Sequence, residues 1–532
     1  MQNISFESDD YKGLAVFGTR ISNSEQCSLI LQDDKNTSLL KTITSETFMF
    51  HFEINTNVHY RLTFENANAN LVYLDTGAKM LNRGIKFLTE VKYNQLYRNR
   101  YHFSPPVGWM NDPNGLVFYK DKVHLFYQFN PFSQIWGNMH WGHAVSTDLI
   151  HWTHLPVVFY PQPELQDRKN LRGGAFSGSA IVKNDLLHVF FTRHYGAFDR
   201  SWAKEWQVKA TSSDGIIFEN EHTVLTADVE GIEHDFRDPK IFAYENHYLM
   251  VIGGKRYGHP VVFLYRSDNT EHWDFVSVLY EETDIKYAVA ECPDFFLLDG
   301  KWVLIVGFIN ENARIKEPRD VKYLTGEFNG TTFKTEHSGL LDYGKDFYAP
   351  QTFLYKNRRI CFGWNSDPRG IYRPQPASAN GTLSLPRELH IEHGSLIQQP
   401  VKEIFYTVKE SPTYTLPFFF NFKINKSKDF TITILSTQEG KVVLKYAKQL
   451  FSIEVAKASC NNTFISDLKQ LEVFVDISLM EIFINNGSMV LTHRYYLEGY
   501  PKILLQIESE TKDYYIKSSN INDIWEKYSD KK

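Results

Sequence analysis

The sequence predicts an all-β protein: a five-bladed β-propeller followed by a C-terminal β-sandwich, with an additional β-rich module at the N-terminus. Three observations predict this fold. Aromatic residues make up 15% of the 532 residues, and they fit half-buried pleated surfaces. A short polar turn recurs five times in the middle of the chain, and both flanks alternate between apolar and polar residues, as strands do. The length is sufficient for two or three domains.

Residues 1–98 are expected to form the N-terminal module. Alternating runs are separated there by turns rich in Asn and Asp, which is typical of short strands: LAVFGTRI, CSLILQDD, FMFHFEIN and YRLTFENA. We interpret this module as a packing or dimerising appendage rather than a sugar-binding one, which leaves a homo-oligomer open.

Residues 99–398 carry the repeat. An apolar stretch precedes each turn and an apolar strand follows it, and the turns lie roughly 55 to 63 residues apart, close to the repeat length of propeller blades. The alternative is a long β-sandwich with coincidental spacing, but the period holds over most of three hundred residues. The five predicted turns are Lys120-Asp121, Lys183-Asn184, Glu245-Asn246, Asp299-Gly300 and Lys356-Asn357.

Each of the first four turns is followed by a further strand-like segment that ends in a turn and a late aromatic residue: Trp152, Phe218, Trp273 and Phe333. A unit of strand, hairpin, strand, turn and strand is typical of a propeller blade. Residues 399–532 alternate again, in runs such as DFTITILS and KVVLKYA, and are predicted to form the sandwich.

Composition excludes several classes of protein. A net charge of -6 gives no basic surface for nucleic acid. No apolar run is long enough to span a bilayer, and the N-terminus carries no secretory signal pattern, so no membrane partner is expected and a cytoplasmic location is predicted. The four cysteines are scattered without CxxC spacing, which argues against a zinc site or a disulfide framework.

Three carboxylates fall at equivalent places in three repeats, just before the turns: Asp112, Asp238 and Glu291. The first strand of each blade lines the channel of a propeller, so these side chains should converge. Glycoside hydrolysis needs two carboxylates, one anionic and one protonated, and a third can bind sugar hydroxyls. Clustering of like charges would raise the pKa of one member.

Each motif also has a simpler explanation. The sequence around Asp112 is Asn-Asp-Pro-Asn-Gly, which by itself is a strong turn sequence. Arg237 and Asp238 are adjacent and could form a local ion pair. Asp294, three residues after Glu291, could be the functional acid instead.

The motifs closely resemble glycoside hydrolase family 32, which contains invertases, inulinases and levanases. The resemblance covers about residues 100–400 and follows one order along the chain: HFSPPVGWMNDPNG from His102, FYQFNP from Phe126, WGNMHWGHAVSTDLIHW from Trp136, FSGSA from Phe176, FRDPK from Phe236, ECPD from Glu291, DFYAPQ from Asp346 and LPREL from Leu385. An ordered series of this length is far more specific than any one of its motifs.

The resemblance implies a retaining β-fructofuranosidase that removes terminal non-reducing β-D-fructofuranosyl residues from sucrose, sucrose 6-phosphate or short fructo-oligosaccharides. Asp112 would be the nucleophile, Glu291 the general acid/base, and Asp238 would hold fructose hydroxyls and stabilise the transition state. No metal or organic cofactor is implied. The positions that would bind the terminal fructosyl ring or lie beside it are Asn111, Gln128, Trp136, Phe176, Ser177, Arg237 and Trp364.

Two features depart from the family pattern. Ala379 stands where many members carry a Trp, which bears on the leaving-group side, and residues 1–98 are absent from the minimal two-domain pattern. An exo-acting fructanase or a transfructosylase would share the same three acids. A non-catalytic carbohydrate-binding protein would require the loss of one acid, and all three are present.

Overall fold

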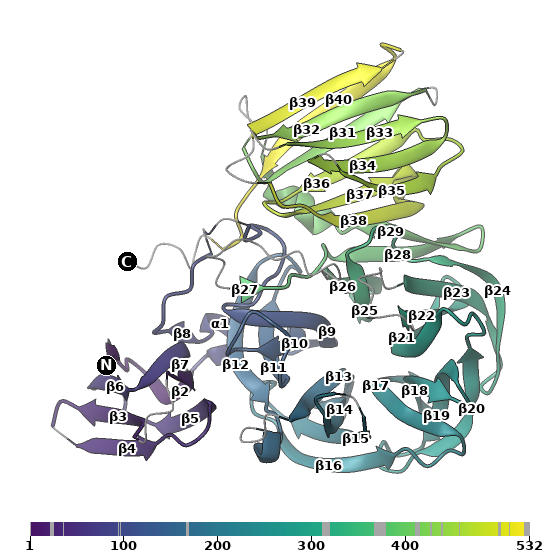
Figure 1. The fold of residues 1–532 in the computed structure, drawn as a ribbon. Coiled ribbons are helices and arrows are strands. Elements are labelled where there is room, and N and C mark those ends of the chain that lie inside the picture. Colours follow the sequence, from purple (N-terminus) through teal and green to yellow (C-terminus); the bar gives the residue numbers. More distant parts are fainter. Residues whose placement is uncertain are drawn as a thin grey trace.

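The computed structural model describes residues 2–21, 26–35, 37–93, 95, 97–165, 170–199, 201–310, 320–365, 379–409, 415–425, 428–437, 440–456, 458–497, 502–509 and 511–525, with the backbone only at 456 and 458–462. Figure 1 shows three parts: the N-terminal module, a ring of sheets, and a sandwich above the ring. The all-β prediction of a propeller followed by a sandwich, with an N-terminal β-rich module, is confirmed. The domain boundaries at residues 98 and 398 remain predictions.

The N-terminal module consists of two four-stranded antiparallel sheets, ordered β1-β6-β3-β4 and β5-β2-β7-β8. Leu14, Val16, Leu62 and Val72 are fully buried in its core. Its elements are β1 (Gln2–Glu7), β2 (Tyr11–Arg20), β3 (Ser28–Asp33), β4 (Ser38–Thr42), β5 (Thr47–Glu53), β6 (His59–Glu65), β7 (Ala67–Gly77), α1 (Met80–Arg83) and β8 (Lys86–Phe87).

Five consecutive antiparallel sheets form in the described part of residues 108–400, and we call them blades one to five. Their elements are β9 (Gly108–Tyr119), β10 (Lys122–Asn130), β11 (His140–Ser146), β12 (Trp152–Phe159); η1 (Pro163–Leu165), β13 (Leu171–Lys183), β14 (Leu186–Ala197), β15 (Ala203–Ser212), β16 (Glu219–Thr226); β17 (Ile232–Tyr244), β18 (His247–Arg256), β19 (His259–Ser267), β20 (Asp274–Glu281); β21 (Tyr287–Leu298), β22 (Lys301–Asn310), β23 (Asp320–Phe328), β24 (Phe333–Leu340); and β25 (Phe347–Tyr355), β26 (Arg358–Asn365), β28 (Arg387–Glu392), β29 (Ser395–Pro400). The first strands, β9, β13, β17, β21 and β25, surround the centre of the ring (Figure 1) and contact one another in turn.

The predicted turns join the first two strands of each blade. Four lie where predicted, and the second lies one residue later, at Asn184-Asp185, because β13 continues through Lys183. Both turn residues have positive φ in four of the five hairpins, as type I′ turns require, which explains the Asn, Asp and Gly found there. The late aromatic residues stand at or beside the start of the fourth strand.

The ring closes through a segment that follows the fifth blade's first hairpin. β27 (Ala379–Asn380) pairs in parallel with β9, at Gly108 and Trp109, and so joins the first sheet. Near the C-terminus, the fully buried Trp525 stacks on Tyr93 with ring centroids 4.6 Å apart. Both ends of the described chain therefore contribute to the packing around the first blade.

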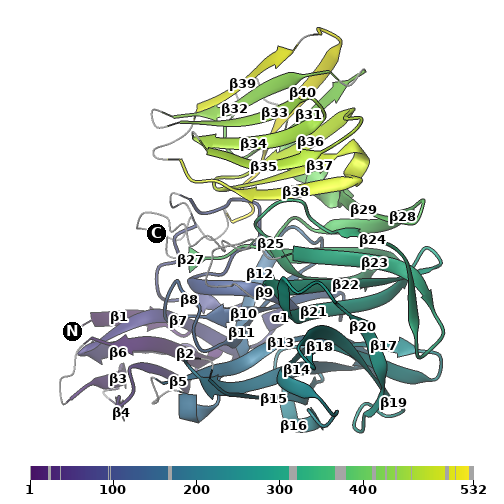
Figure 2. The ribbon, with the colours of Figure 1, turned by 45° about the vertical axis from the view of Figure 1, so that its right-hand side comes forward.

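The C-terminal sandwich packs a six-stranded sheet, β30-β40-β31-β36-β37-β38, on a five-stranded sheet, β35-β34-β33-β32-β39 (Figure 2). Alternate residues Phe418, Phe420 and Phe422 are fully buried between the sheets. Its elements are η2 (Lys402–Thr407), β30 (Val408–Lys409), β31 (Phe418–Ile424), β32 (Phe430–Ser436), β33 (Lys441–Ala447), β34 (Leu450–Ala456), β35 (Ala458–Phe464), β36 (Gln470–Val475), β37 (Leu479–Ile484), η3 (Asn485–Gly487), β38 (Met489–Arg494), β39 (Lys502–Ser509) and β40 (Tyr514–Ile521).

Buried ion pairs join the sandwich to the propeller. His102, just before β9, lies between Asp476 and Glu481 of the sandwich, with N···O distances of 2.8 and 3.0 Å. Arg387 of β28 pairs with the same Glu481 at 2.6 Å and with Asp342 at 2.9 Å. Desolvation opposes charging of His102, but the two carboxylates outweigh it and raise the pKa of its imidazole.

Among the described residues, none of the helices combines the length and apolar character needed to cross a bilayer. Cys27, Cys292 and Cys361 are buried, and none of these three forms a disulfide among the described residues. The side chain of Cys460 lies outside the described residues.

Candidate active site

The first strand of every blade carries a β-bulge, where two of its residues face one residue of the second strand. The bulges are Asn111-Asp112, Phe176-Ser177, Asp238-Pro239, Cys292-Pro293 and Ala349-Pro350. A bulge bends the strand and re-aims its side chains, and a proline suits it because no N–H is needed at an unpaired position. The bulges of the first four blades meet, because Ser177 and Cys292 both contact Asp112 and Cys292 also contacts Asp238.

The three carboxylates do not occupy the same position relative to the bulges. Asp112 is the second residue of its bulge, Asp238 is the first, and Glu291 directly precedes the bulge at Cys292. Relative to the bulge, the three acids therefore differ by one residue from one blade to the next, so their positions are not equivalent. Asp238 and Cys292 have φ values of 66° and 48°, an uncommon conformation for residues with a Cβ and one that is often stored at functional sites.

The carboxylate of Asp112 is held by donors from three blades. Asn111 Nδ2 donates to Oδ1 at 3.1 Å, and Ser177 Oγ donates to Oδ2 at 2.6 Å. Cys292 Sγ approaches the same Oδ2 at 3.6 Å. Asn111 is oriented in turn by Trp109, whose indole N–H donates to it at 2.9 Å. These donors stabilise a negative charge and fix its direction.

Asp238 is buried, with 3% of its surface exposed. The Cys292 N–H donates to its Oδ2 at 2.9 Å, and its own N–H donates to Thr192 Oγ1 at 3.0 Å. Burial raises the pKa of Asp238 well above its ordinary range, and the charges of Glu291 and Asp112 add to the rise while Arg237 opposes it. The expected clustering effect on one acid is therefore found, and it falls on Asp238.

Glu291 is positioned by two side chains. Arg237 Nε donates to Oε1 at 3.1 Å, and the Tyr348 hydroxyl donates to Oε2 at 2.8 Å. Arg237 also pairs with Glu205 at 2.9 Å and with Asp235 at 2.6 Å. Burial acts to lower the pKa of this guanidinium, but the surrounding carboxylates dominate and raise it, so Arg237 stays charged. Arg237 therefore pairs with Glu205, Asp235 and Glu291, and the described side chains show no ion pair between it and Asp238.

Aromatic rings flank the carboxylates. Trp136 packs edge-on against Phe176 with centroids 6.1 Å apart, and Phe176 stacks on His194 at 4.2 Å. On the opposite flank, Trp364 packs edge-on against Trp109 at 5.7 Å and so reaches Asn111 indirectly. Flat rings with polar neighbours are suited to the mixed surface of a sugar.

Gln128 is linked to the carboxylates through other residues. It is buried opposite the first bulge, and its Nε2 donates to the Ala175 carbonyl at 2.9 Å. The amide of Asn114 best fits its surroundings with its oxygen facing Gln128 Nε2 at 3.1 Å and its nitrogen facing Ser177 Oγ at 3.2 Å. Gln128 therefore braces the first two blades beneath Asp112.

Asp294 does not join the cluster. It is fully buried, and its Oδ2 accepts from Lys240 Nζ at 3.0 Å and from the Thr352 N–H at 2.6 Å. A carboxylate committed to a buried lysine and a backbone donor serves to hold neighbouring blades together. Glu291 rather than Asp294 is therefore the acid that meets Arg237.

Several contributors were not in the predicted set of site residues. Tyr348 stands shortly before the fifth turn and Cys292 directly follows Glu291, so their places in the repeat are the signal that could have found them. Glu205 lies on the third strand of blade two, and its only sequence signal is a charge inside the alternating segment AKEWQVKATS. Its contact with Arg237 depends on the packing of two blades and has no local signature.

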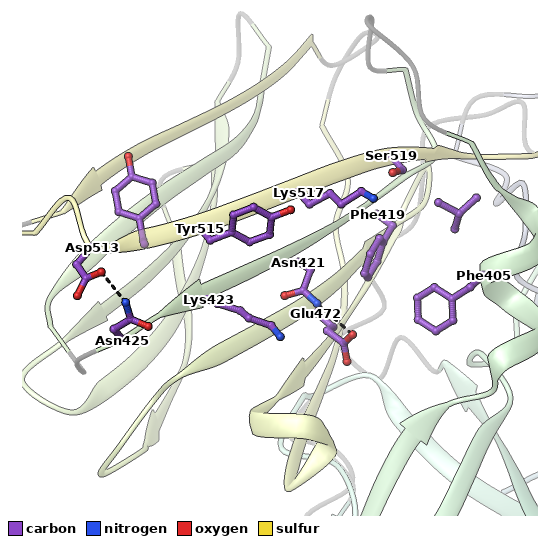
Figure 3. Close-up of a pocket in the computed structure, with 12 residues that line it drawn as sticks. Phe405, Phe419, Asn421, Lys423, Asn425, Glu472, Asp513, Tyr515, Lys517 and Ser519 are labelled. Atoms are coloured by element: carbon purple, nitrogen blue, oxygen red, sulfur yellow. Dashed lines mark hydrogen bonds between the residues drawn. The ribbon is translucent and has the colours of Figure 1, made fainter.

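The largest of the cavities described on the molecule lies elsewhere, on the outer face of the six-stranded sheet of the sandwich, with a volume of about 840 Å³. Figure 3 shows Tyr515, Lys517, Asn421 and Lys423 side by side across β40 and β31, with Glu472 on β36. Asn421 Nδ2 donates to Glu472 at 3.3 Å. The two carboxylates that line this groove, Glu472 and Asp513, accept hydrogen bonds from Asn421 and Asn425. Among the described residues, no group of three or more His, Cys, Asp or Glu side chains is arranged to hold a metal ion.

Comparison with known proteins agrees with this architecture. The model "Glycosyl hydrolases family 32 N-terminal domain" matches residues 102–400, and "Glycosyl hydrolases family 32 C terminal" matches residues 390–522. The chain belongs to glycoside hydrolase family 32. A family member from Escherichia coli, sucrose-6-phosphate hydrolase, is 33% identical over 451 residues, which cover 77% of this chain and 91% of the relative.

Two solved family 32 structures are similar over most of the chain. One from Bifidobacterium adolescentis has a TM-score of 0.89 at 25% identity and covers 99% of this chain and all of the other. A β-fructofuranosidase from Bombyx mori, solved with sucrose, has a TM-score of 0.69 at 28% identity and covers 80% of this chain and 94% of its own. The family 32 match begins at residue 102, so the N-terminal module lies outside it, whereas the similarity to the first structure includes the module.

Proposed function

We propose that this glycoside hydrolase is a retaining β-fructofuranosidase that cleaves sucrose, sucrose 6-phosphate or short fructo-oligosaccharides. The observation that carries the proposal is the convergence of Asp112, Asp238 and Glu291 at the β-bulges of three blades. Ser177 donates to Asp112, the Cys292 N–H donates to Asp238, and Arg237 and Tyr348 donate to Glu291. The family membership, and relatives named as a sucrose-6-phosphate hydrolase and a β-fructofuranosidase, support the substrate class.

Asp112 is the nucleophile of the proposed double displacement. One of its oxygens attacks the anomeric carbon of the fructosyl unit while Glu291 gives a proton to the departing glycosidic oxygen. A fructosyl ester of Asp112 results. Glu291, now deprotonated, takes a proton from water, the water oxygen attacks the same carbon, and the ester bond breaks to restore both carboxyls with overall retention.

Asp238 binds rather than reacts in this scheme. Because its pKa is raised, Asp238 is protonated near neutral pH before the substrate binds. It can therefore both donate to and accept from fructose hydroxyls. The flanking rings Trp136 and Phe176, together with Asn111 and Trp364, would enclose the fructosyl ring. Arg237 and Tyr348 are positioning residues that hold Glu291.

Variants of the two reacting acids test the mechanism. Asp112→Ala and Glu291→Ala should abolish sucrose hydrolysis while their far-UV circular dichroism and thermal transitions stay native-like. Asp268→Ala, at an exposed turn of the same ring, is the matched control and should keep full activity. Azide should restore turnover of Glu291→Ala on a substrate with a good leaving group, since only proton transfer is missing. Ordinary turnover in either acid variant would exclude the assignment.

The stereochemistry and the substrate need separate measurements. Retention predicts about 5 to 5.5 Å between the two reacting carboxyl groups, whereas inversion requires about 6.5 Å or more, and the first anomer detected by NMR decides between them. Thin-layer analysis with sucrose, sucrose 6-phosphate, kestose and inulin separates hydrolysis from fructosyl transfer. Short fructosides should be preferred, and a preference for polymeric inulin would favour an exo-fructanase.

Two further statements are part of the proposal. A cytoplasmic location stays a prediction, and cell fractionation tests it. Self-association through the N-terminal module remains open, and sedimentation velocity of the full chain tests it.

A further inference from the structure

A cleft lies between the N-terminal module and the first blade. One wall comes from the end of β2 and the start of β5, and the other from the connection between β10 and β11, residues 131–139. Its volume is about 450 Å³, within the range of about 300–1,000 Å³ typical of small-molecule sites. The cleft exists only because the chain carries the N-terminal module, which the family 32 match does not include.

The module is fixed rigidly enough to form a wall. Phe17 of β2 is fully buried and packs against Phe132, His140 and Tyr160 of the first blade, with centroid distances of 6.1 to 6.4 Å. Asn70 Nδ2 donates to the Phe132 carbonyl at 3.1 Å. An aromatic cluster of this kind holds the two parts in one orientation, so the cleft is preformed.

The cleft shares a residue with the candidate active site. Trp136 lines it and also packs edge-on against Phe176, whose neighbour Ser177 donates to Asp112. Two residues before Trp136, the Gln134 carbonyl accepts from Asn380 on β27, the strand that pairs with β9. The segment that forms one wall of the cleft therefore contacts both neighbours of β9, the strand that carries Asp112. It reaches β27 through Asn380 and β13 through Phe176.

The lining suits an uncharged sugar chain. Arg20 and Glu46 are the described charged side chains of the lining, and their charges are opposite. Desolvation lowers the pKa of His140 to about 3, so the ring adds no positive charge. Ile135, with 56% of its surface exposed, offers an apolar face, while Thr47 lies on the opposite wall. Mixed apolar and hydroxyl-bearing walls with no excess charge favour glycosyl units over phosphate.

We propose that this cleft binds the sugar units on the leaving-group side of the scissile bond, so that the N-terminal module selects neutral fructo-oligosaccharides of three or more units. This inference rests on the proposed function and names the substrate class of the same site. The sequence-based interpretation of the module as a packing or dimerising appendage stays a prediction beside it.

The test fills the cleft from the module side in the full-length enzyme. Thr47→Trp places a large ring in the cleft, and Thr42→Trp makes the same change on an exposed strand of the same module that does not line it. We expect Thr47→Trp to lower kcat/KM about tenfold or more for a tetrasaccharide such as nystose, which loses contacts of the size of a hydrogen bond and a stacking interaction. Values for sucrose should change less than about twofold, and Thr42→Trp should leave both substrates unaffected.

A second variant covers the case in which Thr47→Trp does not fold. Ile135→Ala removes an exposed contact from the propeller wall, so it should reduce kcat/KM for nystose and kestose but not for sucrose. No change in the ratio of nystose to sucrose in either variant would overturn the inference, as would an equal loss on both substrates. A loss confined to sucrose 6-phosphate would also overturn it, because the cleft would then bind phosphate. Failure of the wild-type enzyme to cleave any fructoside would instead contradict the proposed function.

Discussion

Replacing Asp238 by Asn is expected to stabilise the protein at neutral pH while it removes activity. Burial, with the charges of Glu291 and Asp112, raises the pKa of Asp238 from its ordinary 3.8 to about 8. In the unfolded chain this carboxyl loses its proton near pH 4, whereas the folded chain retains it. Folding at pH 7 must therefore take up a proton. The stability that Asp238 contributes is greatest in acid and falls as the pH rises from about 4 to about 8.

The magnitude follows from that pH interval. Between an ordinary pKa of 3.8 and pH 7, proton uptake costs at most about 4 kcal/mol. An amide keeps an acceptor for the Cys292 N–H but does not reproduce every hydrogen bond of the protonated acid, so the expected gain is about 1–2 kcal/mol. One kcal/mol corresponds to about 1 °C in the melting temperature of a chain this long. Asp238→Asn should thus melt about 1–2 °C higher at pH 7 and at the same temperature as the wild type near pH 4.

Differential scanning calorimetry at pH 4, 5, 6 and 7, with sucrose hydrolysis measured in parallel, checks this. The matched control is Asp294→Asn, which removes a buried carboxylate that is paired with Lys240 and bonded by the Thr352 N–H. That variant should melt lower at pH 7, because it leaves a buried ammonium without its counter-ion. If Asp238→Asn were destabilised at pH 7 to the same extent, the account of Asp238 as a strained, protonated acid would be refuted.

Three further outcomes are expected. Ser177→Ala should lower kcat/KM about 10- to 100-fold without changing the melting temperature, because it removes the 2.6 Å bond to a charged Asp112; steady-state kinetics and calorimetry measure the two effects. Arg387→Met should lower the free energy of unfolding by about 3–5 kcal/mol in urea titrations, because it leaves Glu481 buried and without one partner, and an unchanged midpoint would contradict this. His102→Gln should destabilise the protein below about pH 6.5, where the imidazole is charged in both states, and the difference should shrink as the pH rises through the raised pKa of His102; melting curves from pH 6 to pH 9 measure it.

The sequence predicted what depends on local chemistry. The turns could be located because Asn, Asp and Gly tolerate the positive φ that a tight hairpin needs, and Asn357 and Gly300 have such values. The one-residue error at Lys183 arose because Lys-Asn and Asn-Asp are equally suitable turn pairs. The three acids could be found because each stands seven or eight residues before such a turn.

The remaining features depend on residues that are distant in the sequence. A bulge is defined by the register of the opposite strand, so the stagger of Asp112, Asp238 and Glu291 cannot be seen in one strand alone. The pKa of Asp238 depends on distances to acids in two other blades. The docking of the module through Phe17 was equally inaccessible, because an apolar residue in an alternating strand does not reveal which partner it packs against.

The parallel pairing of β27 with β9 also delays completion of the first blade during synthesis on the ribosome. The strand that carries Asp112 emerges early, but its partner at Ala379 follows roughly 270 residues later, about 15 to 50 s at typical elongation rates. During that interval β9 has an open edge, and such edges pair readily with other chains. Trp525 completes the packing around Tyr93 later still. Protection of the nascent chain by a chaperone would therefore matter most before residue 379 is made.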